Sequence, residues 1–259
     1  MRRVTFLSLF FFPLFLFCLP ITNPSDPKMH SLGVIFLKTN NISIRTGYLY
    51  TNLYNGKFED KMKIPGSSTP SDIQMNISAA LINLNFFQRL DLLAILGTSD
   101  LQIDQTIYTD RNFLAGCGLK WLMFNLFNLD FALDGKFFQT EQPSTYFVVE
   151  KEVYYLKNKL IQTIRSYEAS LGFSYSKAFL KPYVGATFLY SEILPNYKVG
   201  FLKFQGSELD FDTNDAENKR FFGLAVGMSF LNKKNQSSIT LESKMFNENS
   251  ISLIGQIRF

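Results

Sequence analysis

Residues 249–259 read Asn-Ser-Ile-Ser-Leu-Ile-Gly-Gln-Ile-Arg-Phe, and no other stretch points as clearly to the architecture. Successive side chains of an extended chain point to opposite faces, so every second residue shares a face. One face is apolar apart from a glycine: Ile251, Leu253, Gly255, Ile257 and Phe259. The other face carries the polar side chains Ser252, Gln256 and Arg258. The stretch therefore predicts a β-strand with an apolar side and a polar side.

The same alternation recurs upstream, in residues 43–50, 73–81, 167–176 and 222–230. These segments predict strands of about 9–12 residues with one apolar face and one face of small or polar residues. Two architectures fit such strands. A soluble sandwich buries the apolar face inside, whereas a transmembrane barrel turns it toward lipid.

Three features favour the barrel. The strands match the ~9–11 residues that a tilted membrane-spanning strand needs, and they exceed the ~5–6 residues typical of soluble sheets. The second face is rich in Gly, Ala and Ser, and aromatic residues gather at strand ends, as in the girdles of membrane barrels. We therefore predict an all-β, antiparallel transmembrane β-barrel over residues 42–259. In this interpretation the apolar residues face lipid, including Ile73, Met75, Ile77, Ala79 and Leu81.

The connections between the predicted strands alternate between short and long. Short links fall at residues 83–88, 123–128, 176–181 and 231–236, and longer, more polar links at 55–72, 98–111, 139–163 and 192–218. Such alternation is typical of short periplasmic turns and long outer loops. The pattern gives ten strands. Extra strand pairs within 145–156 and 199–205 would raise the number to twelve, so both numbers stay open.

The N-terminus predicts export. Met1-Arg2-Arg3 precedes an apolar run over residues 4–17, which ends at Cys18-Leu19-Pro20. This is the pattern of a secretory signal peptide, here residues 1–18, with cleavage near Cys18 or a few residues later. A retained anchor is the alternative, but the run is shorter than ~20 residues and Pro13 interrupts it. We expect residues 19–41 to form a periplasmic segment, and the barrel to lie in a Gram-negative-type outer membrane.

Composition excludes several classes of protein. The 259 residues are 46% hydrophobic and 19% charged, with a mean hydropathy of +0.02, which excludes a disordered chain and a polytopic helical membrane protein. The net charge of +4 is scattered and does not predict a nucleic-acid partner. His30 is the only histidine, and Cys117 is the only cysteine left after signal removal. We therefore predict no enzymatic activity, no cofactor and no metal site.

Several short motifs resemble the chlamydial major outer membrane proteins. They are Leu19-Pro20-Ile21-Thr22-Asn23-Pro24-Ser25-Asp26-Pro27, residues 41–48, residues 83–97, Lys181-Pro182-Tyr183-Val184-Gly185 and Gln256-Ile257-Arg258-Phe259. The resemblance implies an outer-membrane porin, usually trimeric, that is also cross-linked by disulfides in the envelope. This chain resembles a shorter, cysteine-poor member of that family. A single mature cysteine does not fit the cross-linked role.

The charged residues that alternation places inside the barrel are the candidate functional residues. They are Arg45, Arg89, Asp91, Lys120, Asp130, Asp134, Lys136, Glu168, Glu242, Lys244 and Arg258. In a water-filled lumen they would bias ion passage, which predicts porin-like diffusion of small solutes and ions. Alternatively, they pair and plug a narrow barrel with a structural or adhesive role, whose outer loops at 139–163 and 192–218 bind a partner. The partners that we expect are outer-membrane lipid, two further copies in a homotrimer, and the barrel-assembly machinery through Phe259.

Overall fold

The computed structural model describes residues 19–28, 42–59, 72–103, 107–149, 152–177, 179–195, 199–204, 207–212, 216–218, 220–232 and 237–259. The predicted signal peptide, residues 29–41 and His30 lie outside these ranges. Within them, no helix is long and apolar enough to cross a membrane.

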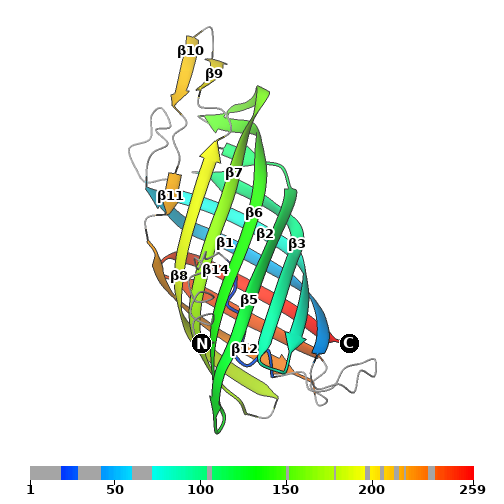
Figure 1. The fold of residues 1–259 in the computed structure, drawn as a ribbon. Helices are drawn as coiled ribbons and strands as arrows, with labels where there is room; N and C mark the ends of the chain where they lie inside the picture. Colours follow the sequence, from blue (N-terminus) through cyan, green and yellow to red (C-terminus); the bar gives the residue numbers. More distant parts are fainter. Residues whose placement is uncertain are drawn as a thin grey trace, which may run out of the picture.

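Ten strands close into one antiparallel barrel (Figure 1). They are β1 (Ile42–Glu59), β2 (Asp72–Phe86), β3 (Leu90–Ile103), β5 (Asn112–Leu126), β6 (Leu129–Val149), β7 (Glu152–Tyr175), β8 (Leu180–Pro195), β12 (Phe222–Leu231), β13 (Ser237–Met245) and β14 (Glu248–Arg258). Each pairs with the next, and β14 returns to β1, with Tyr50 opposite Leu253. The predicted antiparallel barrel is confirmed, with ten strands in the ring. Closure leaves no unpaired strand edge, which a membrane span requires.

Four short strands lie outside this ring. β4 (Ile107–Thr109) pairs with β3 and β6, and β11 (Ala216–Asn218) pairs with β1 and β8. β9 (Val199–Phe204) and β10 (Ser207–Asp212) form a separate two-stranded sheet, at the top of Figure 1. The two segments that left twelve strands open therefore do not enlarge the ring. Residues 146–149 pair with residues 152–155 and extend the β6–β7 pair, and residues 199–204 belong to the separate hairpin.

The connections between β2 and β3, β5 and β6, β7 and β8, and β12 and β13 lie at one end of the barrel, which we name the turn end, and the opposite end is the loop end. The two-residue connection between β13 and β14, Phe246–Asn247, lies on the loop side. At the turn end, Phe87 and Gln88 have φ of 53° and 56°, and the Arg89 N–H donates to the Phe86 carbonyl at 3.0 Å. At the loop end the strands run farther than predicted. β6 and β7 stay paired as far as Val149 and Glu152, so the prediction of a loop over 139–163 is wrong for most of that range. It failed because β6 carries polar side chains on both faces there: Thr140, Gln142 and Ser144 are buried and Glu141 is exposed, a pattern that resembles a loop.

In the half of the barrel nearer the turn end, apolar side chains face outward. Ile251, Leu253 and Ile257 are nearly half exposed, whereas their neighbours Ser252 and Gln256 are buried. The predicted orientation of this strand is confirmed. Cys117 also points outward, from β5. An outward apolar band around a closed, polar-lined barrel is the architecture of outer-membrane proteins.

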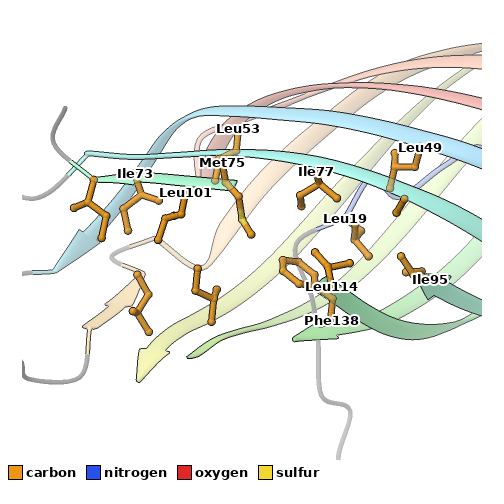
Figure 2. Close-up of a cluster of buried hydrophobic side chains, with 14 of the residues drawn as sticks. Leu19, Leu49, Leu53, Ile73, Met75, Ile77, Ile95, Leu101, Leu114 and Phe138 are labelled. Carbon is orange, nitrogen blue, oxygen red and sulfur yellow. The ribbon is translucent and has the colours of Figure 1, made fainter. Parts of the chain in front are cut away.

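In the half nearer the loop end, polarity is reversed on β1, β2 and β3, whereas β6, β7 and β8 keep buried polar side chains there, including Gln142, Gln162 and Ser191. Figure 2 shows apolar side chains of several strands pointing into the barrel and packing together; this apolar cluster includes Leu49, Leu53, Ile95, Leu101, Leu114 and Phe138. Ile73, Met75, Ile77, Ala79 and Leu81 are also buried inside. The prediction that these five residues of β2 face lipid is therefore wrong. Their strand neighbours Asn76 and Asp100 lie on the outer face instead, hydrogen bonded at 2.8 Å. Outside the bilayer, burial of apolar surface favours the interior.

The apolar band gives a direct prediction. Replacing Leu253 by lysine should destabilise the folded barrel by ~2–4 kcal/mol, the cost of a lysine on the lipid face at the midplane. Denaturant unfolding in lipid vesicles measures this free energy. Gln74→Lys is the control, since Gln74 lies on the polar outer face near the loop end, and it should unfold like the parent. Equal destabilisation by the two lysines would contradict the assignment of the band.

Candidate functional site

Residues Leu19–Lys28, which we name the plug, lie inside the barrel in the half nearer the turn end. Leu19 and Ile21 are each 1% exposed, and Asn23 and Ser25 are fully buried. In Figure 1 the plug appears in dark blue between the strands. The prediction of a periplasmic segment is therefore wrong for residues 19–28. The prediction rested on the position of these residues between the signal peptide and the first strand. That position does not show that the barrel wall offers hydrogen-bonding groups to them.

Wall cations hold the plug by its backbone carbonyls. Lys244 Nζ donates to the Leu19 carbonyl at 2.6 Å, and Lys136 Nζ donates to the Pro20 carbonyl at 2.6 Å. Lys120 Nζ donates to two carbonyls, those of Ile21 at 2.7 Å and Asn23 at 3.1 Å. Arg45 donates to the Asp26 carbonyl at 2.8 Å. Carbonyl oxygens only accept, and ammonium and guanidinium groups only donate, so the two sets are complementary. Bonds to charged donors are stronger than neutral ones. The wall thus recognises the main chain of the plug.

Wall carboxylates hold the backbone N–H groups of the same segment. Glu168 accepts from the Leu19 N–H at 2.9 Å. Glu242 accepts from Ile21 at 2.9 Å and from Thr22 at 3.0 Å, one bond to each of its oxygens. The Tyr183 hydroxyl donates a further bond to Glu242 at 2.6 Å. These side chains come from β7, β8 and β13, so the plug ties together strands that are far apart in sequence.

Two glycines in the wall make room for plug side chains. A Cβ at Gly172 would come within 2.5 Å of Pro24, and one at Gly185 within 2.4 Å of Ile21. Both distances are shorter than real Cβ contacts. The wall of β7 and β8 is therefore shaped to the plug as well as charged to match it.

The structure places ten of the eleven candidate residues inside the barrel. The buried residues are Arg45, Asp91, Lys120, Asp130, Asp134, Lys136, Glu168, Glu242, Lys244 and Arg258. Arg89 is the exception, since it lies exposed in the turn between β2 and β3. The prediction for Arg89 is wrong because alternation has no meaning within a turn.

Three further candidates, Asp91, Asp130 and Asp134, form ion pairs within the lumen, as the plugged alternative expects. Asp91 forms an ion pair with Arg45. Asp134 lies 3.8 Å from Lys120 and pairs with Lys136, and Asp130 lies 3.4 Å from Lys28 of the plug. Removing Arg45 would leave the buried Asp91 without this partner.

Little space remains between plug and wall. A cavity of about 20 Å³ is lined by residues that include Thr22, Asp26, Arg45, Asp91 and Lys120. This volume holds a single water molecule. Leu19, at the inner end of the plug, packs into the apolar cluster, which fills the lumen toward the loop end. The described lumen is therefore filled along both halves.

A polar groove lies on the outside of the barrel near the loop end. It has a volume of about 260 Å³ and is lined by Asn52, Asn76, Asp100, Arg111 and their neighbours. Tyr108 and Tyr146 stack beside it with ring centroids 5.1 Å apart. Within the described ranges, no three His, Cys, Asp or Glu side chains are grouped so that they could bind a metal ion.

Sequence reasoning found the wall of this site and missed its occupant. The plug has no periodicity, because it is neither strand nor helix, so the patterns that revealed the strands are silent there. The charged residues predicted inside gave no signal either, because their five carboxylates and four cations other than Arg89 and Arg258 could pair with one another.

Comparisons with known proteins return outer-membrane barrels. The β-domain of the Bordetella autotransporter BrkA is 7% identical (TM-score 0.48, covering 85% of this chain and 99% of that one). An outer membrane channel from Pseudomonas putida F1 is 12% identical (0.41; 84% and 95%), and the protease OmpT from Escherichia coli is 9% identical (0.37; 84% and 93%). No family model and no curated protein matches the chain.

Proposed function

We propose that this protein is a structural outer-membrane barrel that its own residues 19–28 close to solutes. One observation carries the proposal: buried charged side chains of the wall bind the plug backbone on both its carbonyl and its N–H sides. A segment bound in this way is a built part of the lumen. The apolar cluster closes the other half by a separate mechanism.

Porin-like diffusion of small solutes and ions is the competing hypothesis. It requires that residues 19–28 leave the lumen and that the apolar cluster separate as well, because each fills its own half. The charged residues of the wall would then line a water-filled passage. The disposition of the described residues favours the plugged barrel, since it gives Lys120, Lys136 and Lys244 each a carbonyl partner in the plug.

Conductance across a planar bilayer distinguishes the two. The chain from Leu19 to Phe259, refolded and checked for the gel shift on heating that folded barrels show, should give no sustained single-channel steps. A second chain, from residue 29 to Phe259, tests the role of the plug. Both chains carry Lys136→Cys, and the rate at which a water-soluble thiol reagent modifies this cysteine is measured. If the shorter chain folds, its cysteine should react faster than the cysteine of the plugged chain. Sustained steps from the longer chain would overturn the proposal in favour of the porin.

Several expectations from the sequence remain predictions. They are the membership suggested by the resemblance to chlamydial major outer membrane proteins, the homotrimer, recognition of Phe259 by the assembly machinery, and the absence of enzymatic activity. An adhesive role belongs with the structural one, and the outer groove beside Tyr108 is the described surface on which a partner search should begin.

A further inference from the structure

The backbone nitrogen of Leu19 lies at an unusual place for a peptide group. It donates to Glu168 Oε2 at 2.9 Å, where Leu19 is 1% and Glu168 2% exposed. The second carboxylate oxygen, Glu168 Oε1, is buried and has no hydrogen-bond partner. A peptide N–H carries one proton and cannot serve both oxygens, so the site offers one more acceptor than the amide can use.

Two donors beside Glu168 reach the same oxygen. Lys244 Nζ donates to Glu168 Oε2 at 2.5 Å, and the Leu19 nitrogen donates to that oxygen as well. Oε1 is therefore left without a donor, although it lies on the same carboxylate as two hydrogen bonds. A second N–H at the Leu19 nitrogen would supply one.

We propose that Leu19 is the first residue of the mature protein and that its α-ammonium group is the ion-pair partner of Glu168. An ammonium at this atom has three N–H donors instead of one, which suffices for both oxygens of Glu168. It also places a second cation beside Glu168, next to Lys244. The lumen is then a receptor for the free N-terminus of its own chain.

The free amine arises by hydrolysis of the Cys18–Leu19 peptide bond by a membrane-bound signal endopeptidase. Water adds its oxygen to the Cys18 carbonyl carbon as the C–N bond breaks, which leaves a carboxylate on the released peptide. The Leu19 nitrogen takes the protons and becomes the ammonium. The apolar run that ends at residue 17 supports cleavage at this place independently of the hydrogen-bond geometry at Glu168.

Packing fixes the position of the Leu19 nitrogen beside Glu168. The Leu19 side chain belongs to the apolar cluster, together with Leu49, Leu114 and Phe138 (Figure 2). Leu19 is 1% exposed, so its backbone nitrogen is held at the carboxylate by burial on the side-chain side as well.

The first test is the chemical state of the N-terminus. Intact mass and N-terminal sequencing of protein taken from outer membranes should give a chain that begins at Leu19 with an unmodified amine. An amine-acylating reagent should label that amine in unfolded protein and leave it unlabelled in the folded barrel. A different first residue, or labelling at equal rates in both states, would overturn the proposal.

The second test asks whether the charge on Leu19 acts on Glu168. Two refolded chains are compared, one that begins at Leu19 and one that carries an extra methionine before it, which moves the ammonium by about 3.8 Å. Each is made with Glu168 and with Glu168→Gln. The extra methionine should lower the thermal midpoint by several degrees when Glu168 is present, and much less when it is Gln. An equal shift in both backgrounds would overturn the pairing. Neither test measures conductance, so their outcome is separate from that of the proposed function.

Discussion

Replacing Lys120 and Lys136 together by glutamate should expel residues 19–28 from the lumen. The two ammonium groups hold the carbonyls of Pro20, Ile21 and Asn23, and both lie beside Asp134. Glutamates would place carboxylates against carbonyl oxygens and against Asp134, with no donor to satisfy them. Breaking one buried pair costs roughly 3–5 kcal/mol, so reversing two exceeds what the plug can offset.

Limited proteolysis measures this effect most directly, because residues 19–28 should become cleavable in a barrel that still shifts on heating in gels. The matched control is Lys177→Glu with Arg220→Glu, which changes the net charge equally at exposed positions and should leave the plug protected. A plug that stays protected in the lumenal variant would contradict the assignment. If the variant conducts, the added carboxylates should make it prefer cations, and its reversal potential shows the preference.

Glu242→Ala should be the most destabilising single substitution in the wall. It removes the acceptor for the Ile21 and Thr22 N–H groups and for the Tyr183 hydroxyl, all of which are buried. We expect a loss of roughly 3–5 kcal/mol in the free energy of unfolding, the range for a broken buried network. Denaturant unfolding in vesicles measures it.

Two further variants make this second result specific. Tyr183→Phe removes one donor and leaves both backbone bonds, so it should cost about 1 kcal/mol. Glu141→Ala alters an exposed carboxylate of β6 and should change little. If the loss in Glu242→Ala equals that in Glu141→Ala, Glu242 does not hold the plug.

Alternation along the chain was enough to predict the strands. It predicted which face of a strand lies inside only for the half of the barrel nearer the turn end. An alternating pattern shows that Ile77 lies on the same face as the residues two positions before and after it, and the same holds for Leu253. The pattern does not show which of the two faces is inside the barrel. Leu253 lies outside, in the apolar band, whereas Ile77 lies inside. The side is chosen by the surroundings of the strand, lipid for one and water for the other, and no local pattern records them.

The lumenal charges were predictable for a different reason. Lys120, Glu168 and Lys244 lie in segments where the residues directly before and after them are predicted to face outward. Placing these three on the outer face instead would have put a charge in lipid. Their purpose was not predictable, because it depends on Leu19, which is 101 residues or more from each of them in sequence. Cross-chain complementarity of this kind is visible only once the ring has closed.

The length of the β6–β7 pair has a consequence for the cell surface. At ~3.3 Å per residue and a tilt near 40°, the 24 residues of β7 rise roughly 60 Å, whereas an outward apolar band is ~25 Å tall. More than half of the length of this hairpin therefore extends beyond an apolar band of that height. The groove beside Tyr108, which lies near the loop end, would then stand in water above the bilayer surface and could be reached without crossing lipid.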